Sequence, residues 1–367
     1  MTTATTTASV IVVGCGYPGR SMGHYHCYQI VNQTACPSTT LSYVVEPWYM
    51  SAKGKTSPGA DIFDAWRKEM EENEGVQFFE TVKEVPAVKE GERRLAIISA
   101  RTSDNPKLFA DCMEIGCHSI YLEKPGAPTV TELEHMRDSA KSAGVTVLMG
   151  FNKNVAKFAT KTMAKSASDG GHVTFVHNNN YSKDDLGECF ERNSEGMLKN
   201  MAIHELALLV TFYGVTTSTI ETVVADKDYS SCQTLVGPSG KEFTDFDKLK
   251  FTITTKDGSV KVSVAADRCG GDDSVGIVTD EDSGTETFRS SMPDEDDLVN
   301  MKELEKKNPG ANTYFYVQDP DYATLKERIG KNCVDGTPAE GVATIDVAVE
   351  TLKVAEYLTP LLLEQLL

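Results

Sequence analysis

The residues that could do chemistry begin with a glycine-rich turn close to the N-terminus. Residues 14–19 have the pattern G-x-G-x-x-G and follow a β-branched stretch at residues 9–13. In this pattern the first glycine permits a tight turn, the second lets the backbone approach a pyrophosphate, and the third allows a helix to pack closely on a strand. The sequence therefore predicts a dinucleotide site made by Gly14, Gly16, Tyr17, Pro18 and Gly19.

An acidic residue, Glu46, ends the next run with strand character, at residues 41–45. A carboxylate at this place can accept hydrogen bonds from the hydroxyls of an adenosine ribose and would repel a 2′-phosphate. We therefore expect Glu46 to contact the cofactor, and we expect that cofactor to be NAD. NADP stays open as an alternative, because a 2′-phosphate could instead be contacted by Arg20, Lys53 and Lys55.

A second candidate site is the tripeptide Glu123-Lys124-Pro125, which follows an expected strand at residues 119–122. The carboxyl ends of the strands form the edge at which open parallel sheets bind ligands. The proline restricts Lys124 to extended conformations, so no helix begins there and the ammonium stays at the strand end. We expect Glu123 and Lys124 to contact the cofactor and Lys124 also to contact the substrate. An ordinary charged strand terminus is the alternative interpretation.

A histidine in the second half of the chain, His204, is a candidate acid or base. It lies four residues after Asn200 in an expected helix at residues 195–212, so the two side chains share a face. Imidazole titrates near neutral pH and suits proton transfer, although many histidines on such faces only fill the core. The other candidate contacts to substrate hydroxyls are Asn152, Lys153, Tyr181 and Asn200.

The elements around the first candidates alternate between strands and helices. Strands are expected at residues 9–13, 41–45, 95–99, 119–122 and 145–149, with helices at 61–74, 106–115 and 129–143. Such alternation predicts an α/β domain with a doubly wound parallel sheet, a Rossmann domain, over residues 9–150. We expect residues 1–8 to be a disordered tail.

From residue 151 onward the pattern changes mainly to strands, at residues 172–181, 219–225, 251–255 and 260–265. The acidic stretch 270–308 is expected to add two strands and exposed loop. The sequence thus predicts an α+β domain over residues 151–337, and its role as the substrate and oligomerisation domain is implied only by the family resemblance given below. A helix at residues 338–358 is expected to close the chain, within a segment 338–367 that packs back toward the first domain.

Composition excludes several other classes of protein. The formal net charge of -18 would repel nucleic acid and anionic membrane surfaces, so we expect neither as a partner. The nine cysteines form no C-x-x-C pair, which favours a reducing, cytoplasmic location over a disulfide framework or a thiolate zinc site. His24, His26 and Cys27 fall in the helix after the glycine turn, where packing explains them, and we expect no metal.

The glycine turn, Glu123-Lys124-Pro125 and the helix that carries His204 together resemble the Gfo/Idh/MocA oxidoreductases, the glucose-fructose oxidoreductase and inositol dehydrogenase-like family. The resemblance covers nearly the whole chain. It implies a Rossmann domain followed by an α+β domain with a large, open, mainly antiparallel sheet, through which subunits associate as a homodimer or homotetramer. The implied activity is NAD(P)-dependent hydride transfer at a CH–OH group of a sugar, polyol or related compound.

The resemblance also implies roles for two residues: His204 as the acid or base, and Lys124 as the group that stabilises the developing alkoxide. Two departures from the family pattern qualify this. Asn200 occupies a position that is usually an aspartate, and Ala100-Arg101-Thr102-Ser103 differs from the usual Thr-Pro segment. A carboxylate would stabilise an imidazolium, whereas an amide can only orient the ring. A non-catalytic dinucleotide sensor of the same fold is therefore the alternative, although the presence of Lys124 and His204 argues against it.

Overall fold

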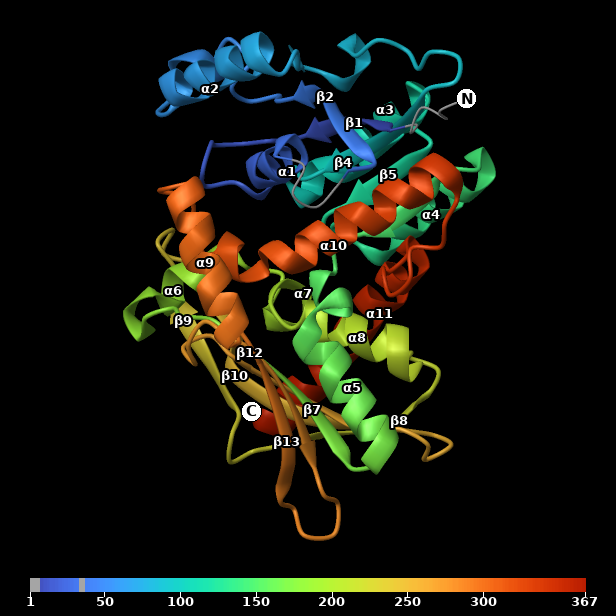
Figure 1. Cartoon of the computed structure of the whole chain (residues 1–367). Helices are drawn as coiled ribbons and strands as arrows, with labels where there is room; N and C mark the ends of the chain where they lie inside the picture. The colour runs from blue at the N-terminus through green and yellow to red at the C-terminus, as the bar shows by residue number, and fades with distance from the viewer. Residues whose placement is uncertain (1–6, 33–36) are drawn as a thin grey trace. The chain divides into compact units, whose positions relative to one another are not determined.

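The computed structural model describes residues 7–32 and 37–367 (Figure 1). Its contacts divide the chain into two compact units, Met1–Asn152 with Asn300–Asp346, and Lys153–Val299 with Val347–Leu367. The sequence places the domain boundary two residues earlier and assigns residues up to 337 to the second domain. In the structure, helix α10 (Thr313–Asp335) belongs to the first unit because it packs on the first helix and on two strands of the first sheet.

The first unit is built on a six-stranded parallel sheet with the order β3-β2-β1-β4-β5-β6. Its strands are β1 Ala8–Val13, β2 Thr39–Val45, β3 Gln77–Phe79, β4 Arg93–Ile98, β5 Ser119–Leu122 and β6 Thr146–Met149. This is the strand order of doubly wound dinucleotide-binding domains, as the sequence predicts. Most of the disordered tail expected at residues 1–8 lies outside the described residues, but Ala8 is buried at the start of β1.

Helices cover this sheet, and α1 and α10 lie side by side (Figure 1). Besides α10, the helices are α1 Met22–Val31, α2 Ala60–Asn73, α3 Asn105–Glu114 and α4 Val130–Ala143, while α9 Glu295–Lys307 runs across the division between the units. Local sequence fixes the ends of α4: the Thr129 hydroxyl accepts a hydrogen bond from the Glu132 amide, and Gly144 ends the helix in a left-handed conformation. Short 3-10 turns lie at Gly54–Thr56, Val82–Glu84, Thr102–Asp104, Asn152–Val155 and Lys183–Asp185.

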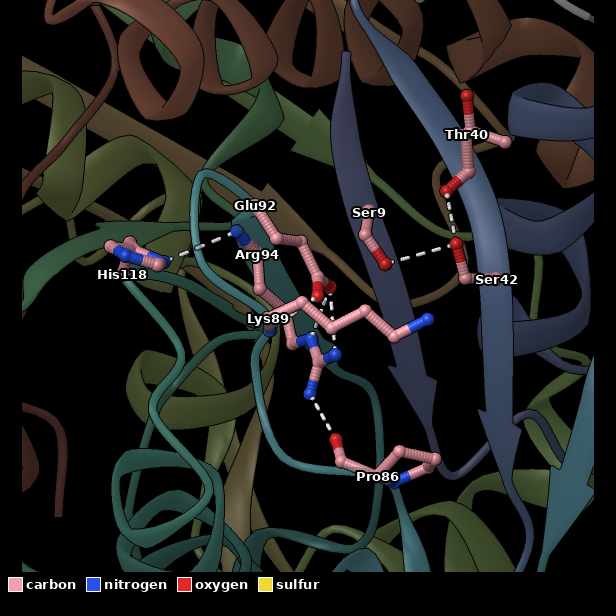
Figure 2. Close-up of polar contacts among 8 residues, drawn as sticks. All are labelled: Ser9, Thr40, Ser42, Pro86, Lys89, Glu92, Arg94 and His118. Atoms are coloured by element: carbon pink, nitrogen blue, oxygen red, sulfur yellow. Dashed lines mark hydrogen bonds and ion pairs between the residues drawn. The ribbon is translucent and has the colours of Figure 1, made fainter. Parts of the chain in front are cut away.

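At the amino end of the sheet, a buried arginine fastens the loop before β4 (Figure 2). Arg94 donates through Nε and Nη2 to Oε1 of Glu92, at 2.9 and 2.7 Å, and through Nη1 to the carbonyl of Pro86 at 2.6 Å. Its guanidinium lies over the ring of Tyr43, and its backbone amide donates to Nδ1 of His118. Each of these N–H groups of Arg94 thus has an acceptor. The cluster has a structural role, and it lies at the end of the sheet opposite to the carboxyl ends of the strands.

The second unit is built on a seven-stranded sheet with the order β13-β12-β7-β11-β10-β8, and β9 pairs with β10. The strands are β7 His172–Asn178, β8 Ile220–Ala225, β9 Ser231–Val236, β10 Glu242–Thr255, β11 Lys261–Asp267, β12 Ser274–Thr279 and β13 Glu286–Met292. Only the β7–β11 pair among these is parallel. This is the mainly antiparallel α+β arrangement that the sequence predicts.

The helices of the second unit differ from expectation. They are α5 Lys157–Asp169, α6 Leu186–Arg192, α7 Met197–Asn200, α8 Ile203–Tyr213 and α11 Ile345–Leu366. Two of them, α5 and α6, were not predicted from the sequence. The prediction of a single helix at residues 195–212 is wrong, because two helices, α7 and α8, occupy this segment. The amides of Met201 and Ala202 both donate to the carbonyl of Met197, so the hydrogen-bond ladder loses its register and α8 starts anew.

The closing helix also differs from the prediction, because its second half packs on the second sheet. The side chain of Gln365 accepts a hydrogen bond from the Ala225 amide at 2.8 Å and donates to the Val223 carbonyl at 3.0 Å, both in β8. The segment just before α11 belongs to the first unit, where the Met149 amide donates to the Ala343 carbonyl. Among the helices that the structure describes, none combines the length and apolar character that crossing a membrane requires.

Candidate active site

The glycine turn after β1 is closed to side chains at two of the predicted positions. Gly14 and Gly16 have φ values of 79° and 69°, which residues other than glycine rarely adopt. A Cβ atom on Gly14 would lie 2.8 Å from Cα of Ala100, just beyond β4, and one on Gly16 would lie 2.7 Å from Cβ of Ser21. Both positions therefore require glycine, and the approach of a pyrophosphate to Gly16 stays a prediction.

The close packing of helix on strand is provided by Gly23, so the role predicted for Gly19 is wrong. A Cβ atom on Gly23 would overlap the carbonyl oxygen of Gly14 and lie 2.7 Å from Cα of Cys15. A Cβ on Gly19 would meet only the carbonyl of Gly310, at an ordinary 3.7 Å. Because α1 begins only at Met22, the second half of the glycine turn is part of a longer loop, residues 17–21, that precedes the helix.

That loop lies against α2 and the segment after β2. The ring of Tyr17 packs on the backbone of Gly59, where a Cβ would lie 2.8 Å from ring atom Cδ2, and meets the ring of Tyr49 edge to face. The Tyr17 amide donates to Oγ of Ser21 at 2.8 Å, and the guanidinium of Arg20 lies over the Tyr17 ring. Tyr17 thus holds the loop in place, and Pro18 next to it is partly exposed.

Glu46 and the glycine turn meet at the carboxyl ends of β1 and β2. The Glu46 side chain is buried, and its Oε2 accepts a hydrogen bond from the Gly16 amide at 2.6 Å. Oε1 accepts from the Trp48 amide at 3.0 Å, which fixes the carboxylate in place. Burial and the adjacent Glu46 raise the pKa of the Cys15 thiol, so this cysteine stays protonated. The arrangement fits a dinucleotide whose ribose hydroxyls donate to a carboxylate and which carries no 2′-phosphate.

An ionised carboxylate, that of Glu123, follows β5 next to Lys124, and its side chain is 13% exposed. Oε1 of Glu123 accepts hydrogen bonds from the Tyr121 hydroxyl at 2.6 Å and from Nε2 of His26 at 3.0 Å. Burial raises the pKa of Glu123, but the bonds from His26 and Tyr121 and the charge of Lys124 outweigh burial and lower it overall. The peptide between Lys124 and Pro125 is cis.

Behind Glu123, a chain of buried polar groups continues into α10. Nζ of Lys326 donates to Nδ1 of His26 at 2.9 Å, and both side chains are almost completely buried. Burial first, and then the Lys326 charge, lower the pKa of His26 to about 4. The neutral ring therefore carries its hydrogen on Nε2 and donates it to Glu123. The sequence offered no signal for the Lys326 contact, because it joins segments three hundred positions apart.

In the second unit, His204 lies in the first turn of α8 and is buried. Its ring meets that of His177, from the end of β7, edge to face at a centroid distance of 6.2 Å. The next residue, Glu205, is fully buried and pairs through Oε1 with Nζ of Lys153 at 2.6 Å and through Oε2 with Nδ1 of His177 at 3.1 Å. Burial raises the pKa of Glu205, yet Lys153 and His177 lower it far below its usual range. Neither Glu205 nor His177 stood out in the sequence.

The remaining predicted contacts lie in separate surroundings. Nδ2 of Asn200, at the end of α7, donates to Glu195 at 2.9 Å, and His204 follows in the separate helix α8. The Tyr181 hydroxyl accepts from Arg192 at 3.0 Å. Asn152 is fully buried in the first unit.

The two histidines of α1 have ordinary partners. Nδ1 of His24 accepts a hydrogen bond from the Gly19 amide at 3.1 Å, and its ring packs on Trp66, while His26 belongs to the chain behind Glu123. Within residues 7–32 and 37–367, no three or more His, Cys, Asp and Glu side chains are grouped so that they could hold a metal ion.

Comparison with known proteins supports the assignment of the first domain. Residues 9–151 match the model of the Gfo/Idh/MocA group, described as an oxidoreductase family with an NAD-binding Rossmann fold. None of the curated protein sequences matches the chain significantly.

Solved structures of low sequence identity share the fold of the whole chain. A myo-inositol 2-dehydrogenase from Lactobacillus plantarum is 16% identical with a TM-score of 0.67, over 98% of this chain and 97% of that chain. A myo-inositol dehydrogenase from Corynebacterium glutamicum is 18% identical with the same TM-score, over 98% and 96%. A scyllo-inositol dehydrogenase from Lactobacillus casei, solved with NAD(H) and scyllo-inositol, is 13% identical with a TM-score of 0.65, over 98% and 96%.

Proposed function

We propose that this chain is an NAD-dependent dehydrogenase of sugars or polyols, because its residues 9–151 match the Gfo/Idh/MocA oxidoreductase family with its NAD-binding Rossmann fold. The observation that carries the proposal is the carboxyl edge of the first sheet. There the glycine turn follows β1, the Glu46 carboxylate binds that turn from β2, and Glu123 and Lys124 follow β5. Ligands of open parallel sheets bind at this edge.

The bound nicotinamide would supply the redox chemistry by taking up the hydride from the hydroxyl-bearing carbon. The chain would then have to manage one proton and one developing negative charge. We assign the proton of the substrate hydroxyl to His204, and we assign stabilisation of the alkoxide to the Lys124 ammonium, through a charge-assisted hydrogen bond. Glu123, ionised beside Lys124, keeps that lysine in its charged form.

The solved relatives suggest the class of substrate to test first. Those named above are inositol dehydrogenases, and one was solved with a cyclic polyol in place. We therefore propose cyclic polyols and related sugars as substrates. Cys15, within the glycine turn, would stay a thiol, since burial raises its pKa.

The test is turnover of inositols, hexoses and linear polyols with NAD, followed through the absorbance of NADH. Lys124→Ala should lower kcat by roughly 10²–10⁴-fold, because the alkoxide loses its cationic partner, while the affinity for NADH changes little. Lys107→Ala, which removes an exposed lysine of α3, is the control. Near-normal turnover by Lys124→Ala on a substrate of the wild type would contradict the assigned role.

One observation favours a second function, a non-catalytic dinucleotide sensor. Asn200, in place of an acidic residue, cannot stabilise a charged imidazole. Saturable NADH binding without turnover of any substrate class would support the sensor and contradict the dehydrogenase.

A further inference from the structure

The second unit contains a buried charged cluster around His204, and the proposed function gives a role only to His204 among its members. The cluster consists of Lys153, His177, His204 and Glu205, which come from a 3-10 turn, the end of β7 and the start of α8. Lys153, His204 and Glu205 are at most 3% exposed, and the His177 side chain is 12% exposed. Burying charged groups costs free energy unless they are paired. These side chains can therefore be buried only because Glu205 pairs with Lys153 and His177.

The hydrogen bonds of Glu205 dictate where the proton of His177 lies. The pKa of Glu205 is held low by Lys153 and His177 against the effect of burial, so the side chain is a carboxylate and can only accept. Nδ1 of His177, 3.1 Å from Oε2 of Glu205, must therefore carry a hydrogen. In the neutral ring, the accepting lone pair is consequently on Nε2. A carboxylate that fixes a tautomer in this way also makes the imidazole more basic.

The same carboxylate lies within electrostatic reach of His204. The groups that act on Glu205 are Lys153, His177 and His204. Lys153 pairs with Oε1 of Glu205, and Oε2 faces the His177 ring, which in turn meets the ring of His204. A positive charge formed on either imidazole is thus stabilised by Glu205.

We infer that Glu205 and His177 together supply the carboxylate–imidazole partnership that Asn200 cannot provide, and that they position and tune His204 for its proton step. The inference rests on the proposed function. In that step the O–H bond of the substrate breaks and its proton passes to His204, while the C–H electron pair leaves as hydride to the nicotinamide and a C=O bond forms. Glu205 stabilises the resulting imidazolium, and His177 is the positioning residue between them.

The first test needs no substrate and follows the imidazole nitrogens by NMR in the full chain labelled with ¹⁵N-histidine. The wild type should show His177 as the Nδ1–H tautomer. The paired variant Lys153→Met/Glu205→Leu replaces the buried ion pair by apolar side chains, which such sites often tolerate. It should shift His177 away from that tautomer. Asp169→Asn, which removes an exposed carboxylate from α5, is the control and should leave the signals unchanged. A His177 tautomer that is the same in all three proteins would overturn the inference.

The second test uses the pH dependence of kcat/KM on a substrate of the wild type. The acid limb reports the deprotonation of the base. Since the Glu205 carboxylate favours the imidazolium, Glu205→Gln should move that limb to lower pH by on the order of one unit, whereas Asp169→Asn should not. If the acid limb stays in place in Glu205→Gln although the NMR change is present, Glu205 acts on His177 alone. That result would overturn its role at His204. Absence of turnover in the wild type would contradict the proposed function while the NMR result still decides the tautomer.

Discussion

At the scale of single residues, we expect the Glu46 carboxylate to determine the choice between NAD and NADP. It is buried beside the Gly16 amide, and its charge at the end of β2 would repel a 2′-phosphate. The sequence predicted the turn, Glu46 and Lys124, because their positions follow from local order along the chain. It could not predict the pairing of Glu205 with Lys153 and His177, because nothing local marks which charged residues become buried neighbours.

Glu46→Gln should therefore weaken NADH binding about tenfold, because a hydrogen bond to a charged acceptor contributes roughly 1.5 kcal/mol. It should also reduce the ratio of the affinities for NADH and NADPH, since glutamine does not repel the 2′-phosphate. Titrating both cofactors into the wild type, Glu46→Gln and the exposed-site control Glu69→Gln measures this. An unchanged ratio of the two affinities in Glu46→Gln would show that Glu46 does not select the cofactor.

At the scale of elements, the approach of α1 to β1 sets the shape of the cofactor turn. The sequence predicted α1, β1 and the turn between them, but it assigned the close contact to Gly19, because the third glycine of the motif usually makes it. The additional loop at residues 17–21 transfers that role to Gly23.

Gly23→Ala should destabilise the first unit by about 1–3 kcal/mol, because the new methyl group overlaps the Gly14 carbonyl and pushes α1 away. Gly19→Ala should cost only about 1 kcal/mol, from its φ of 76°. Thermal unfolding and NADH titration of the two variants compare them. Equal losses of stability and of NADH affinity in both would contradict the packing role of Gly23.

The elements that the sequence missed share a physical cause. α10 has a proline inside it, and its buried face includes Gln318, Asp321 and Lys326, so apolar residues do not recur with a clear helical period. α9 lies in the acidic stretch that was expected to hold strands and loop. Polar residues become buried only where distant partners satisfy them, as His26 does for Lys326, and such partners cannot be identified from local sequence.

At the scale of the whole molecule, stability should depend on pH through the histidines of α1. Burial lowers the pKa of His24 to about 4, from an ordinary 6.5. The folded chain therefore keeps this ring neutral, while the unfolded chain protonates it below pH 6.5. The stabilisation is complete above 6.5 and is lost as the pH falls toward 4, which amounts to at most about 3 kcal/mol.

Both tryptophans, Trp48 and Trp66, lie in the first unit, so tryptophan fluorescence follows its unfolding. The Tm of the wild type should fall between pH 7 and pH 4.5. His24→Phe keeps an aromatic ring against Trp66 and should reduce that fall, whereas His135→Gln, at an exposed site, should not. Identical pH dependence in the wild type and His24→Phe would rule out the contribution of His24.

We also expect the chain to form a homodimer or homotetramer through the sheet of the second unit, as its resemblance to the family implies. Light scattering at several protein concentrations measures the mass directly. A single species at the monomer mass of 40.0 kDa over the whole range would contradict this expectation.

The most direct test of the central claim is titration of the purified wild-type chain with NADH and with NADPH, followed by quenching of tryptophan fluorescence. The account predicts saturable binding of NADH and distinctly weaker binding of NADPH, because the glycine turn admits the pyrophosphate and Glu46 disfavours the 2′-phosphate. Tighter binding of NADPH would contradict the role of Glu46. Failure of either cofactor to bind would contradict the dehydrogenase and the sensor alike.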